Sequence, residues 1–332
     1  MLQSATEQKL EALGLKLPAA PAPVGAYVPF VRTGNLVVTS GQLPWQGDRL
    51  VLTGKLGPEL TLEQGQAAAR VAALNALAQL KAAAGDLDRV RQIVRLEGYV
   101  HCGPGFRGGD FTASILRFDP AKGQQVPEVY SRGNRNPFGF DWDERGRLID
   151  AEHGPMADHP EELNHIRQGK HYGFPYVFGN NKRPDYDDAP APPKDLKFEP
   201  PIRNVGPGGL LGDHPMYSLA PHSAPGGLVF YRSGRLPKRY DNSFFLARFG
   251  NLVNYNRIGF DVLNVRLEEK DGRLTAHTER FLDRLGRPID LCVRDGRLYV
   301  VEYCRQTETV GPGSEGFTAG GRVLEVTAAP AP

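Results

Sequence analysis

The sequence predicts two joined units of different fold class, an α+β unit followed by an all-β unit. Its 332 residues exceed the usual size of one domain, and each part is long enough to bury a core of its own. The apolar pattern changes near Gly105–Asp110, from a helical period upstream to the period of two that is typical of strands downstream. We therefore divide the chain at about residue 108, into residues 1–107 and residues 108–328.

The composition is that of an ordinary globular protein and excludes several classes. Hydrophobic residues make up 40% and charged residues 23%, and a net charge of +2 gives no basis for nucleic-acid binding. Three cysteines without metal-ligand spacing argue against a disulfide framework. The N-terminus has no basic and apolar regions of a signal peptide, and no run approaches the ~18 apolar residues of a membrane span. We therefore expect a cytoplasmic protein without a membrane span.

A long amphipathic helix is the clearest local signal of the first unit. Thr61 and Gln64 have the spacing of a capping box, and apolar positions then recur along one stripe as far as Lys81. Gly85 supplies a C-terminal stop. Because such a helix must cover a sheet, the strand-like runs Leu36–Ser40 and Ile93–Val100 give the order β–β–α–β with an antiparallel sheet.

Four motifs of this unit together resemble the RidA/YjgF family of imine deaminases, also called endoribonuclease L-PSP. They are Gly25–Val28, Thr33–Leu36, Val38–Pro44 and Gly85–Val90. The resemblance implies a trimer whose clefts bind 2-imino acids and deliver water to them, with Tyr27, Ser40 and Gly41 lining the cleft. The arginine and the acidic residue that complete the family's site have no counterpart after Phe106, so this unit is incomplete. The alternative is that Tyr27 and Ser40 only hold a fragment of the fold.

The second unit repeats one form, in which an apolar strand, a charged glycine turn, Arg-Leu and another strand follow each other. It occurs at Phe138–Leu148, Gly227–Leu236 and Ile289–Leu298. Ser114–Pro120, Phe260–Leu267 and Gly321–Val326 supply outer strands. Repeated hairpins of this kind predict propeller blades, here a partial propeller. An open β-meander is the alternative.

The motifs between these hairpins, in their order, resemble the glucose/sorbosone dehydrogenases. They are Arg135–Gly139, Ala151–Pro155, Glu161–Asn164, Gly169–Pro175, Pro221–Pro225 and Gly286–Asp290. These dehydrogenases are six-bladed quinoproteins that use pyrroloquinoline quinone (PQQ), and they are usually exported. By this resemblance Arg135 and Asn136 face the quinone and Arg287 pairs with a PQQ carboxylate. Arginine offers the planar fork that a carboxylate accepts.

The same resemblance implies calcium at two places. The main-chain carbonyls of Gly154 and Pro155 would hold the ion that polarises the quinone, and Glu162 with the Tyr172 region would form a second, structural site. Calcium prefers carbonyl and carboxylate oxygens, which turns of this kind expose.

The group that removes the sugar's hydroxyl proton is not evident. In the family, a histidine placed before the strand that corresponds to Ser114–Asp119 does this, and here the first unit occupies that region. His153 and His222 are the nearest candidates because they lie in the cofactor-facing loops. The alternative, which their position in loops favours, is that both are structural imidazoles that bond to the backbone.

Three functions remain open for the whole chain. The first is a PQQ- and calcium-dependent oxidoreductase that acts on a sugar and passes electrons to an acceptor, impaired because each part lacks an essential group. The second is a RidA-type imine deaminase, and the third is a non-catalytic fusion remnant. An incomplete propeller exposes strand edges and apolar faces, so we expect self-association, as a trimer or an aggregate.

Overall fold

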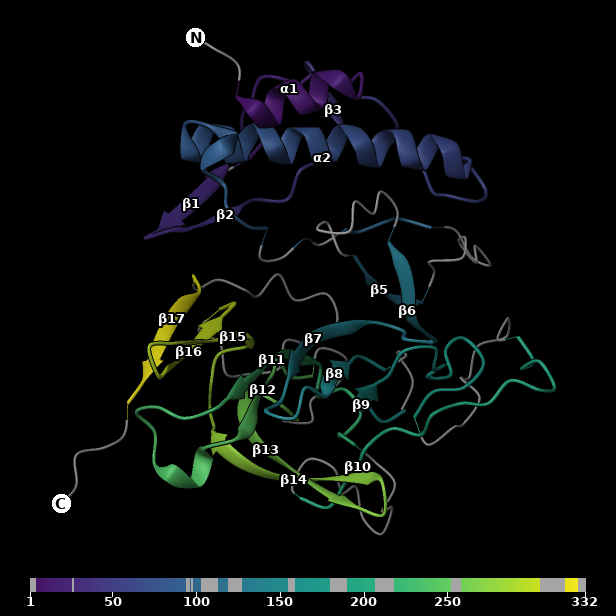
Figure 1. Cartoon of the computed structure of the whole chain (residues 1–332), viewed down its shortest axis with the longest axis vertical. Helices are drawn as coiled ribbons and strands as arrows, with labels where there is room; N and C mark the ends of the chain where they lie inside the picture. Colours follow the sequence, from purple (N-terminus) through teal and green to yellow (C-terminus); the bar gives the residue numbers. More distant parts are fainter. Residues whose placement is uncertain are drawn as a thin grey trace. The chain divides into compact units, whose positions relative to one another are not determined.

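The computed structural model describes residues 4–25, 27–93, 96, 98–102, 113–118, 127–154, 159–179, 190–206, 218–251, 258–304 and 320–327. The chain divides into two compact units, Met1–Gly108 and Gly109–Pro332 (Figure 1).

The first unit is built around the 23-residue helix α2 (Leu62–Ala84). The side chain of Thr61 accepts the N–H of Gln64, and the side chain of Gln64 accepts the N–H of Thr61. Gly85 ends the helix in the left-handed conformation, at φ 82°. The predicted helix, its capping box and its stop are therefore confirmed.

Amide side chains on α2 hold the loops around it. Asn75 is buried and donates to the carbonyls of Leu43 and Trp45, both at 3.0 Å, and Gln79 donates to the carbonyl of Pro21 at 2.7 Å. The other elements of the unit are α1 (Ala5–Ala12), β1 (Phe30–Thr33), β2 (Leu36–Thr39), β3 (Trp45–Gln46), β4 (Arg49–Leu50) and η1 (Leu87–Arg89). In the part of the chain that the structure describes, no helix has the length and apolar character needed to cross a membrane.

The prediction of a strand over Ile93–Val100 is wrong for the residues described there. Ile93, Leu96, Tyr99 and Val100 are 55% to 85% exposed, and none of them belongs to a strand. A strand depends on a neighbour that satisfies its backbone, and β1 pairs with β2 in a sheet of only two strands. The described residues therefore do not complete the order β–β–α–β.

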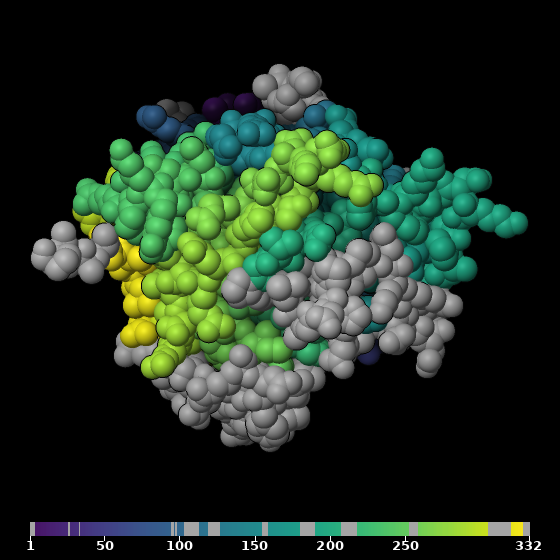
Figure 2. All heavy atoms as spheres, turned by 90° about the horizontal axis from the view of Figure 1, so that it is seen from below, coloured from purple at the N-terminus to yellow at the C-terminus, as the bar shows by residue number. Residues whose placement is uncertain are grey.

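The second unit is all-β with few helices, as predicted. Its strands are β5 (Ser114–Arg117), β6 (Glu128–Arg132), β7 (Pro137–Trp142), β8 (Leu148–Glu152), β9 (Glu162–Ile166), β10 (Arg203–Asn204), β11 (Pro225–Tyr231), β12 (Ser243–Arg248), β13 (Asp261–Lys270), β14 (Arg273–Leu282), β15 (Pro288–Arg294), β16 (Arg297–Glu302) and β17 (Arg322–Val326), with the short helix η3 (Lys238–Tyr240) before β12. They form the sheets β5-β6, β7-β8-β9, β10-β14-β13-β12-β11 and β15-β16-β17. Figure 2 shows the β13–β14 hairpin, in light green, crossing the surface of this unit.

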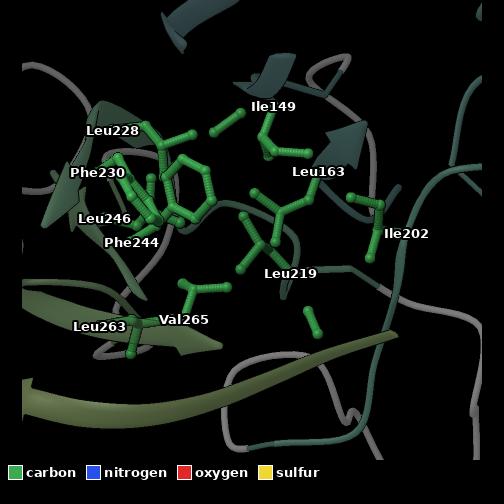
Figure 3. Packing of buried hydrophobic residues seen from close by; sticks show 12 residues of the cluster. Ile149, Leu163, Ile202, Leu219, Leu228, Phe230, Phe244, Leu246, Leu263 and Val265 are labelled. Carbon is green, nitrogen blue, oxygen red and sulfur yellow. The ribbon is translucent and has the colours of Figure 1, made fainter. Parts of the chain in front are cut away.

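The three larger sheets stack on one another through two apolar cores. Strand β11 contacts both β7 and β15, so the first strands of these sheets lie side by side. Phe244 and Leu246 of β12 point into the core against β8 and β9, where Ile149 and Leu163 face them (Figure 3). Phe245 points to the opposite core, against β15 and β16. This alternation is the period of two that the sequence shows.

The repeated hairpins of the sequence are present as β7–β8, β11–β12 and β15–β16, and the predicted outer strands as β5, β13 and β17. The described strands do not close into a ring. A six-bladed closure therefore stays a prediction.

Replacing Leu246 by alanine is expected to lower the free energy of unfolding of the second unit by about 3 kcal/mol, because Leu246 is fully buried between two sheets and the change leaves a cavity. Denaturant unfolding measures the effect. Val323→Ala, at a site that is 63% exposed, is the control and should change it by less than about 0.5 kcal/mol. Equal effects of the two changes would show that the inter-sheet core is not formed.

Candidate functional site

Polar residues of the second unit gather where strands begin and end. Pro137 at the start of β7 pairs with Glu152 at the end of β8, which pairs with Glu162 at the start of β9, so these ends share one edge of the sheet. Strand β11, which begins at Pro225, contacts β7. We call the residues at this edge the strand-end site; they are Arg135, Asn136, Glu152, His153, Gly154, Glu161, Glu162 and residues 222–225.

Glu152 fixes the turn that carries the two predicted quinone contacts. Its carboxylate is fully buried, and its Oε2 accepts the backbone N–H groups of Arg135 at 2.5 Å and of Asn136 at 3.1 Å. Its Oε1 accepts the amide of Asn164 on β9 at 2.9 Å. Burial raises the pKa of Glu152 to about 7 in spite of these hydrogen bonds.

Arg135 is the cation of the site. Its guanidinium is half-buried, donates from Nη1 to the carbonyl of His153 at 3.0 Å and lies 5.9 Å from the centre of the Phe174 ring. Asn136 is exposed, and its carbonyl accepts the N–H of His153 at 3.2 Å. The structure thus places Arg135 and Asn136, the two predicted quinone contacts, against the loop that holds His153.

His153 has its ring engaged on two sides. Nε2 lies 2.6 Å from the carbonyl oxygen of Pro225, and the ring stacks on Phe138 with centroids 5.3 Å apart. A carbonyl only accepts, so Nε2 carries a proton. Burial lowers the pKa of His153, and the charge of Arg135 lowers it further.

Glu161 joins the two loops that carry the candidate histidines. It is 5% exposed; its Oε2 accepts the N–H of Gly154 at 2.5 Å, and its Oε1 accepts the N–H of Ala224 at 3.2 Å. Burial raises its pKa to about 7, although both hydrogen bonds and the charge of His222 act in the other direction. The sequence analysis assigned no role to Glu161 or Glu152; for Glu152 alone, an acidic residue at the end of the buried strand β8 was a usable signal.

Two further carboxylates lie buried beside Glu152. Burial and the charges of Glu152 and Glu162 raise the pKa of Asp150 well above its ordinary value, and burial and Glu152 do the same to the pKa of Glu162. Oδ1 of Asp150 and Oδ1 of Asn164 are buried acceptors without a hydrogen-bond partner. This cluster of buried carboxylates must hold protons or a cation, because unpaired buried charge is strongly unfavourable.

The residues predicted to bind metal are only partly brought together. Gly154 donates to Glu161, and Glu162 accepts the N–H of Gly179 at 2.7 Å, whereas Pro155 lies outside the described residues. The hydroxyl of Tyr172 donates to the carbonyl of His165 at 2.5 Å. Among described residues, no three His, Cys, Asp or Glu side chains converge as metal ligands.

Arg287 directly precedes β15, whose first residues lie against the start of β11, so it lies at the same strand ends as Arg135. It is fully buried, with its guanidinium 5.1 Å from the centre of the Phe249 ring and 4.5 Å from that of Phe260. Nη1 donates to the carbonyls of Gly250 and Asn251, both at 3.0 Å. It reaches the strand-end site through the backbone, since the N–H of Gly250 bonds the carbonyl next to His222.

In the first unit, Tyr27 and Gly41 line one small cavity of about 40 Å³, together with Gln42, Trp45 and Gln79. Ser40 does not line it: its hydroxyl donates to the carbonyl of Val28 at 2.5 Å. The structure therefore joins two of the three residues that the sequence placed in a cleft.

In the presence of EDTA, the melting temperature of the second unit should fall as the pH rises from about 5 to about 8. In the folded state the pKa of Glu152 and of Glu161 is about 7, against an ordinary value of 4.5. Between these two pH values the folded state therefore binds more protons than the unfolded state. Their contribution to stability is complete below about pH 4.5 and is lost as the pH rises through about 7. Thermal unfolding at each pH measures the slope, which Glu152→Gln should reduce. A melting temperature that rises steadily over this range would contradict the assignment.

Two family models match the chain. A YjgF/chorismate mutase-like model matches residues 7–104, and a glucose/sorbosone dehydrogenase model matches residues 112–309. Both resemblances seen in the sequence are thereby confirmed.

Individual proteins match each part. The chain is 46% identical over 105 residues to protein TCP17 of Trypanosoma cruzi, which covers 32% of this chain and 66% of that protein. It is 38% identical over 66 residues to quinoprotein glucose dehydrogenase B of Acinetobacter calcoaceticus, a match that covers 20% of this chain and 13% of that protein. The solved PQQ-bound aldose sugar dehydrogenase of Streptomyces coelicolor is 24% identical over 64% of this chain and 51% of that chain, with a TM-score of 0.38. The chain spans less than two thirds of each of these proteins.

Proposed function

The chain belongs to the glucose/sorbosone dehydrogenase family, whose model matches residues 112–309, and we propose that it is a PQQ- and calcium-dependent oxidoreductase that acts on a sugar. The observation that carries the proposal is the strand-end site. There a half-buried arginine, two histidines and buried carboxylates gather at the strand ends of two neighbouring sheets. A carboxylated quinone and a polar substrate require groups of this kind.

The residues at the edge fit PQQ through Arg135 and Asn136. Arg135 is half-buried, and its guanidinium has further N–H donors beside the Nη1 bond to His153 that a carboxylate can accept. PQQ, when bound, accepts the two electrons and the hydrogen that the sugar carbon loses. Arg287 is closed off from solvent, so we propose that it supports the cofactor only by holding the loop at Gly250 and Asn251.

Calcium is the cation proposed for this edge. The carbonyls of Gly154 and Pro155 would hold it near the quinone, and Glu162 would serve the second ion. The orphan acceptors of Asp150 and Asn164, among carboxylates whose pKa is raised, support a cation in this region. The remaining group, the acceptor of the sugar's proton, is His153 or His222, and the electrons leave to an external acceptor.

Adding PQQ with calcium is expected to raise the melting temperature of the chain, because a ligand that binds only the folded state stabilises it, by about 2.7 kcal/mol at 100 times its Kd. Arg135→Ala should remove most of this shift. Arg294→Ala, whose side chain is 63% exposed on β15, is the control and should retain it. A full shift in Arg135→Ala would refute the cofactor assignment.

The second candidate function is imine deamination by the first unit, and the cavity that holds Tyr27 and Gly41 favours it. The chain is expected to speed the loss of 2-iminobutyrate in a coupled assay. Tyr27→Ala should reduce this activity about tenfold or more. A chain that shows neither this activity nor PQQ binding would be the non-catalytic remnant.

We also propose that the first unit contributes to self-association of the chain. Val31 and Val38 are paired across the β1–β2 hairpin and are 54% and 52% exposed. An apolar pair on an open strand face favours contact with a second copy, as in the proposed trimer.

A further inference from the structure

The three larger sheets of the second unit repeat one arrangement at their strand ends. In each sheet a proline begins the first strand of the repeated hairpin and pairs with the charged residue that ends the second strand. The three pairs are Pro137 with Glu152, Pro225 with Arg248 and Pro288 with Glu302. These strand ends are therefore equivalent positions of one repeated unit.

A residue with a side-chain ring follows each of the three charged residues. These residues are His153, Phe249 and Tyr303. The N–H of each donates to the carbonyl of the residue that precedes the proline of the same hairpin. The acceptors are Asn136 at 3.2 Å, Ala224 at 2.9 Å and Arg287 at 2.9 Å. The same backbone hydrogen bond thus fixes the three ring-bearing residues at the same place in each sheet.

The starts of β7, β11 and β15 lie against one another. Gly139 leaves no room for a side chain against the carbonyl of Gly226, and Gly226 leaves none against the carbonyl of Ile289. Glycine permits this close approach because it has no side chain. Tyr303, bonded through its N–H to the residue just before β15, therefore lies at strand ends that adjoin the strand-end site.

The first two rings each face the start of the next sheet along the chain. Nε2 of His153 lies 2.6 Å from the carbonyl oxygen of Pro225, at the start of β11. The centre of the Phe249 ring lies 5.1 Å from the guanidinium of Arg287, just before β15. Both residues are half-buried, so their rings serve contacts inside the protein.

Tyr303 occupies the third of these positions and is the exposed one. It belongs to the sheet β15-β16-β17 and is 53% exposed. Its ring centre lies 5.9 Å from that of Phe249, with the two rings tilted against each other. The backbone bond to Arg287 and the contact with Phe249 hold Tyr303 in place, and its exposed surface remains for a ligand at these strand ends.

We propose that Tyr303 binds the cyclic sugar by packing its ring against the sugar's C–H face. The proposal rests on the sugar oxidation proposed above. A cyclic sugar carries C–H groups on the faces of its ring and hydroxyl groups at its rim. An aromatic ring packs on the C–H groups, while the hydroxyl groups turn to polar residues such as those of the strand-end site.

The position of Tyr303 assigns it to the sugar instead of the quinone. Arg135, the proposed contact of the quinone, is tied to Glu152 of the sheet β7-β8-β9. Tyr303 follows β16, and β11 lies between the two sheets, in contact with both β7 and β15. A cofactor held at Arg135 therefore leaves Tyr303 to the other ligand of the reaction.

The test measures kcat and KM on the full chain loaded with PQQ and calcium, with the aldose that the wild-type chain oxidises fastest. Tyr303→Ala should raise KM about fivefold or more and change kcat by less than about twofold, because the ring binds the sugar without touching the bonds that change. Tyr303→Phe keeps the ring and should keep KM within about twofold. Neither change should alter the rise in melting temperature that PQQ and calcium produce.

Trp142→Ala is the matched control. Trp142 is 51% exposed and also packs edge-on against another ring, that of Phe140 at 6.1 Å. It ends β7, whereas the strand-end site lies at the start of that strand, so KM should stay within about twofold of the wild-type value.

The outcomes separate this assignment from the proposed function. A wild-type KM in Tyr303→Ala, an equal rise in Trp142→Ala, or loss of the PQQ-induced melting shift in Tyr303→Ala overturns the role of Tyr303 alone. A wild-type chain that oxidises no aldose with PQQ and calcium overturns the proposed function, and this assignment with it. A raised KM confined to Tyr303→Ala, with kcat and the melting shift kept, supports the sugar contact.

Discussion

The carboxylate of Glu152 connects the sheet of the second unit to its candidate chemistry. One of its oxygens holds the backbone of Arg135 and Asn136, and the other holds Asn164 on the neighbouring strand. Because the carboxylate is fully buried, each of these donors offsets part of its desolvation, and removal of any one leaves a polar group without compensation. The turn that presents Arg135 is thus tied by hydrogen bonds to strands β8 and β9, which carry Glu152 and Asn164.

The stacked sheets explain why polar chemistry is confined to the strand ends. Both faces of β12 are buried, with Phe244 and Leu246 in one core and Phe245 in the other. A strand in that position has no open face on which a substrate could lie. Loops at the ends of the strands are the places where main-chain donors and charged side chains meet, and the left-handed turn at His222 lies there.

Local signals made part of this structure predictable from the sequence. Helix α2 is set by Thr61, Gln64 and Gly85, which act within a few residues of its ends, and the hairpins are set by glycine turns. The strand predicted over Ile93–Val100 is absent from the residues described there. A strand depends on a partner that lies far away in the sequence, and composition does not reveal that partner. Glu161 was overlooked for the same reason: its two donors, Gly154 and Ala224, are far apart in the sequence, and only the fold brings them to one carboxylate.

Arg135 and Arg287 show why a shared residue type is insufficient evidence for a shared role. The resemblance implied that Arg135 faces the quinone and that Arg287 pairs with a PQQ carboxylate, and the structure leaves Arg135 half-buried and Arg287 fully buried. Arg287 donates from Nη1 to two main-chain carbonyls, and its guanidinium lies close to two aromatic rings. Its hydrogen bonds hold the loop whose next contact is the carbonyl of Ser223. The hydrogen bonds of Arg287 therefore help to fix the backbone next to His222.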